Sequence, residues 1–175
     1  KAGTDRKSKS GVIWHTQGSG KSLTMVFLTL KIRRDEALRD YKLVFITDRT
    51  QLDNQLTATF QNTQNETVHH AESIRDLKDL LQKDSSDIVM GMVQKFQESA
   101  DESEFPVLNE SDKIIVLADE AHRTQYGTLG AAINVALPNA PKIAFTGTPL
   151  IRSEKTSNEF GSYIDTYTIE QSVED

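Results

Sequence analysis

The sequence predicts an α/β domain with a mostly parallel central sheet and helices on both faces. Short apolar runs alternate with longer segments of helical periodicity, and this alternation is typical of βαβ units. The runs 42–47 and 113–118 are apolar at nearly every position, as expected for strands that are buried on both sides. Unusual polar residues follow directly after several runs, which is where ligands bind in parallel α/β sheets.

The composition is that of an ordinary globular chain. Its 175 residues include 20 Lys and Arg against 26 Asp and Glu, a formal net charge of −6. The chain has no cysteine, so disulfides and thiolate metal sites are excluded. No apolar run approaches the roughly 20 residues of a membrane span, so we expect no membrane partner. The acidic balance argues against binding nucleic acid over the whole surface but allows a local basic groove.

The length favours a single domain over residues 1–175. We expect residues 1–10 to be a flexible basic lead-in, and the polar, acidic stretch 97–112 to be a surface insertion, mostly loop. The chain has no initiator methionine, so we expect it to be a fragment of a longer protein.

The predicted strands are short apolar runs bounded by turn residues. Val12 and Trp14 belong to a run that leads into a Gly-rich turn, and a later run is stopped by Gly147 and Pro149. The final run alternates like an edge strand. The strands are expected at 11–15, 42–47, 67–70, 87–92, 113–118, 142–146 and 163–169.

The predicted helices show apolar residues at every third or fourth position. Leu23, Val26, Phe27 and Leu30 form such a stripe in the first helix, and Ser73 is placed to cap a later one. The helices are expected at 22–38, 51–60, 73–82 and 126–137.

A Gly-rich segment between the first strand and the first helix has the pattern of a phosphate-binding loop. Gly18 and Gly20 let the backbone curl so that its N–H groups point at phosphate oxygens. Lys21 would reach the β- and γ-phosphates, and the Ser22 hydroxyl would ligate Mg²⁺. The usual pattern opens with Gly or Ala, whereas His15 stands here. The predicted nucleotide-binding residues are Thr16, Gln17, Gly18, Ser19, Gly20, Lys21 and Ser22.

An acidic pair follows the strand at 113–118. Asp119 can hold Mg²⁺ together with Ser22, and Glu120 can orient and deprotonate an attacking water. Taken alone, such a pair is usually a solvated turn, but the upstream phosphate loop favours the functional interpretation. Lys21, Asp119 and Glu120 are therefore the predicted catalytic residues, with ATP and Mg²⁺ as cofactors.

A third turn, Thr146-Gly147-Thr148-Pro149, follows the strand at 142–146. Its small hydroxyl residues could sense the phosphate state through the carboxylate pair, and His122 could couple the site to movement. A simple turn is the alternative interpretation. The predicted coupling residues are His122, Thr146 and Thr148.

Two weaker signals follow the strands at 42–47 and 87–92. Arg49 and Thr50 could hold a DNA phosphate, and Gln94 and Lys95 could do the same. Ordinary solvated loop residues are an equal alternative at both places.

The three turns, in this order on strand ends, resemble the first RecA-like motor domain of superfamily-two helicases and translocases. The residues in and around these motifs resemble one subgroup more specifically, the restriction subunit of type I restriction-modification enzymes. This resemblance covers nearly the whole chain from Gly11 on. The matching stretches are Trp-His-Thr-Gln-Gly-Ser-Gly-Lys-Ser-Leu-Thr-Met at 14–25, Thr-Asp-Arg at 47–49 with Leu52, Asp53 and Gln55, Val-Gln-Lys-Phe at 93–96, Asp-Glu-Ala-His-Arg at 119–123, Phe-Thr-Gly-Thr-Pro-Leu at 145–150, and 160–169.

The resemblance implies an ATP-dependent type I site-specific deoxyribonuclease that pumps duplex DNA past its methyltransferase and specificity subunits. It also implies a nuclease domain and a second motor domain elsewhere in a longer chain, and a location in the cytoplasm of a bacterium or archaeon. The second motor domain would carry an arginine finger, which is worth orders of magnitude in rate. We therefore expect this fragment alone to be nearly inactive.

Two alternatives stay open. One is a motor domain of another superfamily-two DNA or RNA helicase or remodeller. The sequences Trp-His-Thr-Gln at 14–17 and Gln-Lys-Phe at 94–96 disfavour it. The other is a non-catalytic nucleotide-binding scaffold, which the presence of Glu120 disfavours.

Overall fold

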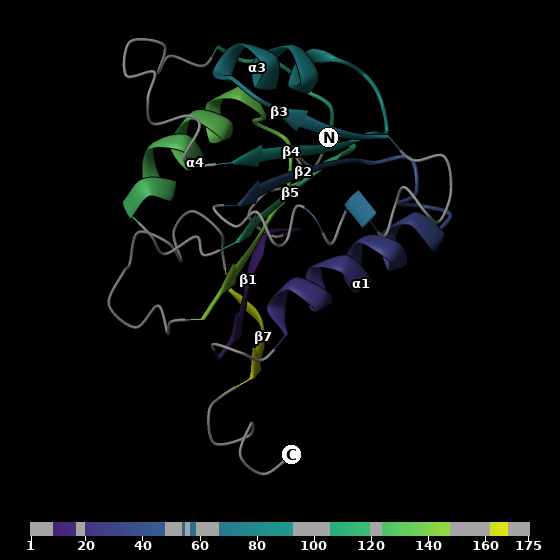
Figure 1. The fold of residues 1–175 in the computed structure, drawn as a ribbon, viewed down its shortest axis with the longest axis vertical. Coiled ribbons are helices and arrows are strands. Elements are labelled where there is room, and N and C mark those ends of the chain that lie inside the picture. The colour runs from purple at the N-terminus through teal and green to yellow at the C-terminus, as the bar shows by residue number, and fades with distance from the viewer. Residues whose placement is uncertain are drawn as a thin grey trace, which may run out of the picture.

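The computed structural model contains one parallel β-sheet with helices on both faces (Figure 1). It describes residues 9–16, 20–47, 54, 57–58, 67–92, 106–119, 124–147 and 162–167. Within these residues every strand pair is parallel, and the order across the sheet is β3-β4-β2-β5-β6-β1-β7. The strands are β1 Gly11–His15, β2 Lys42–Thr47, β3 Val68–Ala71, β4 Ile88–Met92, β5 Ile114–Asp119, β6 Lys142–Thr146 and β7 Tyr163–Tyr167.

The helices form the two outer layers. Helix α1 (Lys21–Arg34) covers one face of the sheet, and α3 (Ile74–Gln82) and α4 (Thr124–Ala136) cover the other (Figure 1). Alternate residues of the central strand β2 belong to the two cores, because successive side chains of a strand point to opposite faces. Val44 packs on the side of α3 and α4, and Phe45 packs on the side of α1. The predicted fold class is confirmed.

The predicted first helix exists, but its buried face is not the predicted stripe. Leu23 and Phe27 are 52% and 65% exposed. Lys21, the first residue of α1, points inward and is buried, and this sets the phase of the helix. Residues four, eight and eleven positions further on are then buried as well, namely Met25, Thr29 and Ile32. The helix also ends at Arg34, earlier than predicted, where the backbone of Asp35 takes an extended conformation.

The helix predicted at 73–82 is confirmed together with its cap. The backbone N–H of Asp76 donates to the Ser73 hydroxyl at 3.1 Å, which satisfies one of the first N–H groups of α3. Ile74, Leu77 and Leu81 are buried under α3. This helix therefore packs with the single apolar stripe that its sequence indicates.

Some predicted elements fall mostly outside the described residues. The helix expected at 51–60 is represented only by residues 54 and 57–58, which are helical. In the expected insertion at 97–112, residues 106–112 contain no helix or strand. No helix among the described residues combines the length and apolar character that crossing a membrane requires.

Candidate functional site

The carboxyl ends of β5, β6 and β1 meet at one edge of the sheet. These strands are neighbours in the order β5-β6-β1, and Phe145 of β6 pairs with Asp119 on one side and with Ile13 on the other. Neighbouring strands are about 4.8 Å apart, so β1 and β5 run about 10 Å apart with β6 between them. Asp119 thus ends its strand at the level of Ile13, close to the point at which β1 ends at His15.

Lys21 lies at the end of β1. Its Nζ donates to the carbonyl oxygens of His15 and Thr16, each at 3.2 Å, and the residue is 6% exposed. The ammonium group is therefore held beside the segment that joins β1 to α1. Gly20, which precedes it, has a φ of 78°, a left-handed conformation that favours glycine.

The amino end of α1 suits an anion. Gly20 occupies the capping position, no side chain caps the helix, and its first turn contains no acidic residue. The first N–H groups of a helix and its dipole favour negative charge, phosphate above all. Ser22, half-buried in this first turn, adds a hydroxyl beside Lys21.

Asp119 and Thr146 complete the described part of the site. Asp119 is 4% exposed and Thr146 is 1% exposed, at the ends of β5 and β6. A buried carboxylate is costly unless opposite charge is close. Carboxylate and hydroxyl oxygens are ligands that Mg²⁺ prefers, usually together with phosphate oxygens and water. The pair Asp119 and Ser22 therefore fits Mg²⁺, and Lys21 with the amino end of α1 fits a nucleotide phosphate.

The remaining predicted site residues lie outside the described residues. The strands that precede them are described, and β2 and β4 are neighbours whose carboxyl ends face the same edge as β5. The site residues concerned are Gln17, Gly18, Ser19, Arg49, Thr50, Gln94, Lys95, Glu120, His122 and Thr148.

Two residues of β7 contact the start of the turn after β1, and sequence reasoning did not identify them. His15 Nε2 donates to Asp165 Oδ2 at 2.7 Å, and this bond lowers the pKa of Asp165 below its ordinary value. The backbone N–H of Thr16 donates to the carbonyl oxygen of Tyr167 at 3.1 Å. The departure from Gly at the first loop position, His15, was the available signal, but the sequence did not show its partner.

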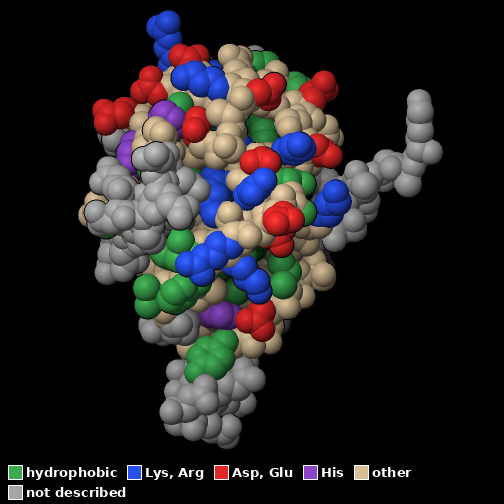
Figure 2. Space-filling view, turned by 90° about the vertical axis from the view of Figure 1, so that its right-hand side faces the viewer, with side chains coloured by type: hydrophobic (Ala, Val, Ile, Leu, Met, Phe, Trp, Pro, Cys, Tyr) green, Lys and Arg blue, Asp and Glu red, His purple; other side chains and the backbone are tan. Residues whose placement is uncertain are grey.

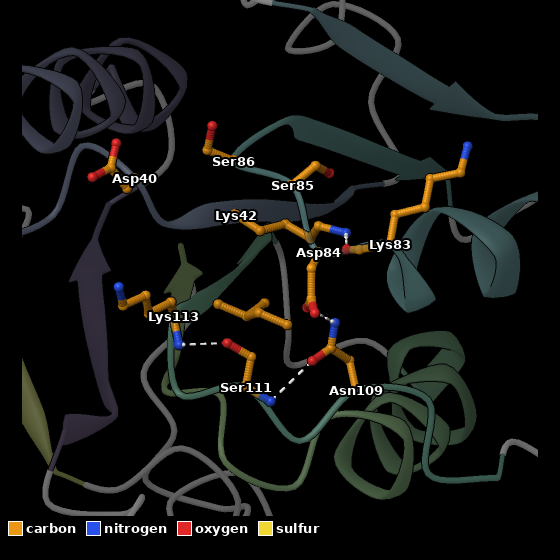
Figure 3. Close-up of a pocket in the computed structure, with 10 residues that line it drawn as sticks. Asp40, Lys42, Lys83, Asp84, Ser85, Ser86, Asn109, Ser111 and Lys113 are labelled. Atoms are coloured by element: carbon orange, nitrogen blue, oxygen red, sulfur yellow. Dashed lines mark hydrogen bonds between the residues drawn. The ribbon is translucent and has the colours of Figure 1, made fainter.

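A polar cavity of about 540 Å³ lies at the opposite edge, where the strands begin (Figure 3). Its buried Lys42 donates to the carbonyl oxygen of Leu80 at 2.6 Å and to that of Lys83, and burial lowers the pKa of Lys42. Asn109 donates to the Asp84 carboxylate at 3.2 Å, which also ties two walls together. Figure 2 views this side and shows basic and acidic side chains interspersed. We therefore assign this cavity a structural role.

Fold and site together define a RecA-like domain of the P-loop ATPase class. The chain belongs to the SWI2/SNF2 ATPase family, whose model matches residues 1–175. The resemblance to type I restriction subunits is confirmed by relatives that carry this name.

The HindI endonuclease subunit of Haemophilus influenzae, a type I restriction enzyme subunit, is 41% identical over 182 aligned residues, covering 94% of this chain and 17% of the relative. A Methanocaldococcus jannaschii relative, whose name assigns it to the type I restriction enzyme MjaIXP, is 40% identical over 169 residues, covering 96% of this chain and 16% of the relative. The chain thus spans about one sixth of the length of these relatives.

Solved helicase structures share the fold. The UvsW helicase of bacteriophage T4 superimposes with a TM-score of 0.55 at 16% identity, over 90% of this chain and 54% of that one. The Hef helicase domain of Pyrococcus furiosus gives a TM-score of 0.60 at 15% identity, over 94% of this chain and 35% of that one. At these identities the likeness establishes the fold alone.

Proposed function

We propose that this domain binds ATP with Mg²⁺, hydrolyses it, and thereby drives duplex DNA through a type I restriction endonuclease. The observation that carries the proposal is the placement of a buried lysine and a buried aspartate at the ends of β1 and β5, one strand apart. The names of the relatives support an endonuclease subunit of a type I restriction enzyme. Within that class we propose the activity of an ATP-dependent type I site-specific deoxyribonuclease, with the methyltransferase and specificity subunits as partners. We place the protein in the cytoplasm of a bacterium or archaeon.

In this proposal the phosphates bind at the amino end of α1. Backbone N–H groups of residues 17–22 would surround the phosphate oxygens, since the N–H of Thr16 already donates to Tyr167. The Lys21 ammonium, which has three N–H groups, would keep its carbonyl partners His15 and Thr16 and direct the third N–H group toward the β- and γ-phosphates. Ser22 and Asp119 hold Mg²⁺, which would neutralise charge on the phosphates. The buried position of Lys21 and Asp119 strengthens both interactions, because water screens them little.

Glu120 directly follows Asp119 in the sequence, and a second acid at this place can serve a second role. We assign it the orientation and deprotonation of the attacking water. Thr146, buried at the end of the intervening strand β6, would sense the phosphate state together with Thr148 and His122. These three residues would couple hydrolysis to movement.

We place the DNA contacts in the turns that follow β2 and β4. The strands β2 and β4 are neighbours whose carboxyl ends lie at one sheet edge. We infer that the turns that follow them, with Arg49 and Thr50 in one and Gln94 and Lys95 in the other, bind the same nucleic acid backbone. Such contacts would hold phosphates without reading sequence. This agrees with a motor that travels along DNA of any sequence.

Replacement of Glu120 by Gln in the intact protein tests the proposal. The ATPase rate should fall by about a hundredfold or more, because the general base is lost, while nucleotide binding persists. Lys21→Ala should instead lose binding. The rates are measured with duplex DNA and with RNA as activators. Turnover that is unchanged in Glu120→Gln would refute the catalytic assignment, absence of turnover in the wild type would favour a scaffold, and stimulation by RNA alone would favour another helicase.

A further inference from the structure

The strand β7 pairs with β1 along its length and also contacts the residues at which β1 enters the phosphate loop. Asp165 pairs in register with Ile13, yet its carboxylate reaches along the strand to His15. Residues at such diagonal positions of paired strands interact when one side chain is long enough. The side chain of His15 is 13% exposed, whereas that of Asp165 is 62% exposed. The pair therefore joins the half-buried last residue of β1 to an exposed residue of β7.

The two loop residues that β7 contacts are also the two that hold the catalytic lysine. His15 and Thr16 supply the carbonyl oxygens that accept from Lys21 Nζ. The same residues bond to β7 through the His15 side chain and the Thr16 backbone N–H. A continuous series of hydrogen bonds therefore runs from β7 through the start of the loop to Lys21.

The pairing of β7 with β1 depends on a particular residue of β1, although β7 is mostly exposed. A Cβ atom on Gly11 would lie 2.3 Å from the Ile164 side chain, so the close approach of the two strands requires glycine there. The first four residues of β7 are exposed, and the strand contributes none of the buried core residues. Elements with few buried contacts open at low free energy. The position of β7 can therefore change without unfolding the domain.

We propose that β7 is a positioning element for the phosphate loop, and that the His15–Asp165 pair raises the affinity of the domain for ATP. This inference rests on the proposed nucleotide function. His15 and Asp165 are positioning residues, because they act on the nucleotide through the loop backbone and Lys21. By reciprocity of linkage, whatever moves β7 changes ATP affinity, and ATP binding biases β7 toward its docked position.

The test uses the intact protein and N-methylanthraniloyl-ATP with Mg²⁺ as the fluorescent probe. Asp165→Ala and His15→Gln should each weaken binding by about two- to fivefold, the effect expected from one partly exposed hydrogen-bonded pair. The double variant should weaken it no further than either single one, because both remove the same bond. Asp165→Glu should keep most of the affinity. The ATPase should show a raised KM at an unchanged kcat.

Thr166→Val is the matched control, because Thr166 lies on the same exposed strand and a β-branched residue is kept. Its affinity should equal that of the wild type. Equal affinity in Asp165→Ala, or an equal loss in the control, would overturn the positioning role and leave only strand docking, which thermal unfolding would report. Lys21→Ala separates this failure from failure of the proposed function: if it abolishes binding while Asp165→Ala has no effect, the nucleotide site stands and the positioning role falls. Unchanged binding in Lys21→Ala would refute both.

Discussion

Two adjacent residues at the start of α1, Gly20 and Lys21, have different structural requirements. Gly20 must adopt a left-handed backbone so that the chain can turn, and Lys21 must enter the helix with its side chain directed inward. The requirement at Gly20 is conformational and not steric, since a Cβ atom there would meet nothing within 4 Å. The backbone angle alone therefore makes glycine necessary.

Replacement of Gly20 by Ala should destabilise the protein by about 1–2 kcal/mol, the cost of a left-handed conformation for a residue with a Cβ atom. Urea denaturation measures the change. Gly20→Asn is the matched control and should recover part of the loss, because asparagine tolerates this conformation better. Equal losses in the two variants would mean that strain in the backbone is not the cause.

The single residues of the site could be named from the sequence, whereas their partners could not. Lys21 and Asp119 stand in short motifs whose chemistry is local, so their type and spacing are enough to propose them. The contact of His15 with Asp165 joins residues 150 positions apart. Nothing in the local pattern of either strand indicates it, because a cross-strand pair depends on the strand order and register.

At the level of the element, the phase of α1 is decided by its first residue. The apolar stripe predicted from hydrophobicity and the observed buried face share Val26 but differ in Leu23 and Phe27. Periodicity recognises only apolar residues, so it could not count a buried lysine and a buried threonine as part of the inner face. The strands were predicted more accurately than the buried face of α1. In a strand that is buried on both sides, no single buried face has to be identified.

The two phases of α1 are distinguished by a pair of substitutions. Met25→Ala should cost about 2–5 kcal/mol, because Met25 is fully buried and its removal leaves a cavity. Phe27→Ala should stay within about 0.5 kcal/mol, as is usual for an exposed position. Chemical denaturation of the purified protein measures both. A larger loss in Phe27→Ala than in Met25→Ala would restore the predicted stripe.

The carboxyl end of α3 is held by a buried lysine of β2, and this gives a stability that depends on pH. Removal of the Lys42 side chain in Lys42→Met leaves two carbonyl oxygens at the end of α3 without this donor. Both carbonyl groups are only partly buried, so we take the lower end of the cost of an unsatisfied acceptor, about 1 kcal/mol. We therefore expect a loss of this size in urea denaturation near neutral pH. Lys113→Met, at the exposed rim of the same cavity, should be nearly neutral.

The direction of the pH dependence follows from the lowered pKa of Lys42. Between its folded pKa and the ordinary value of 10.5, the unfolded chain binds more protons than the folded one. The contribution of Lys42 to stability must then rise with pH across that window. The stability difference between wild type and Lys42→Met should therefore grow as the pH approaches 10.5. A difference that shrinks over this range would contradict a pKa of Lys42 lowered by burial.

For the whole molecule, the sheet order brings the carboxyl ends of β1, β5 and β6 to one edge, and the three turns that we predict to be functional follow these strands. The chain visits β1 first, β5 fifth and β6 sixth, yet these strands lie side by side. The opposite edge carries the polar cavity, whose buried lysine is bonded to the protein's own carbonyl groups. The residues that stabilise the fold around the cavity thus lie where the strands begin, and the proposed chemistry lies at the carboxyl ends of the strands. The sequence predicted the parallel sheet but not this order, which depends on long-range packing.

The proposed site makes the stability of the whole domain depend on nucleotide and metal together. In the presence of Mg²⁺, a slowly hydrolysed ATP analogue is added at about a hundred times its Kd. The free energy of unfolding should then rise by about 2.7 kcal/mol. Urea denaturation with and without EDTA separates the metal-dependent part. Asp119→Asn should lose that part, because the proposed Mg²⁺ ligand loses its charge. Asp112→Asn, in the exposed bend that precedes the same strand, should keep it. If Asp119→Asn were stabilised by Mg²⁺ as much as the wild type, the metal would have to bind elsewhere, and the convergence of β1 and β5 would no longer explain the chemistry.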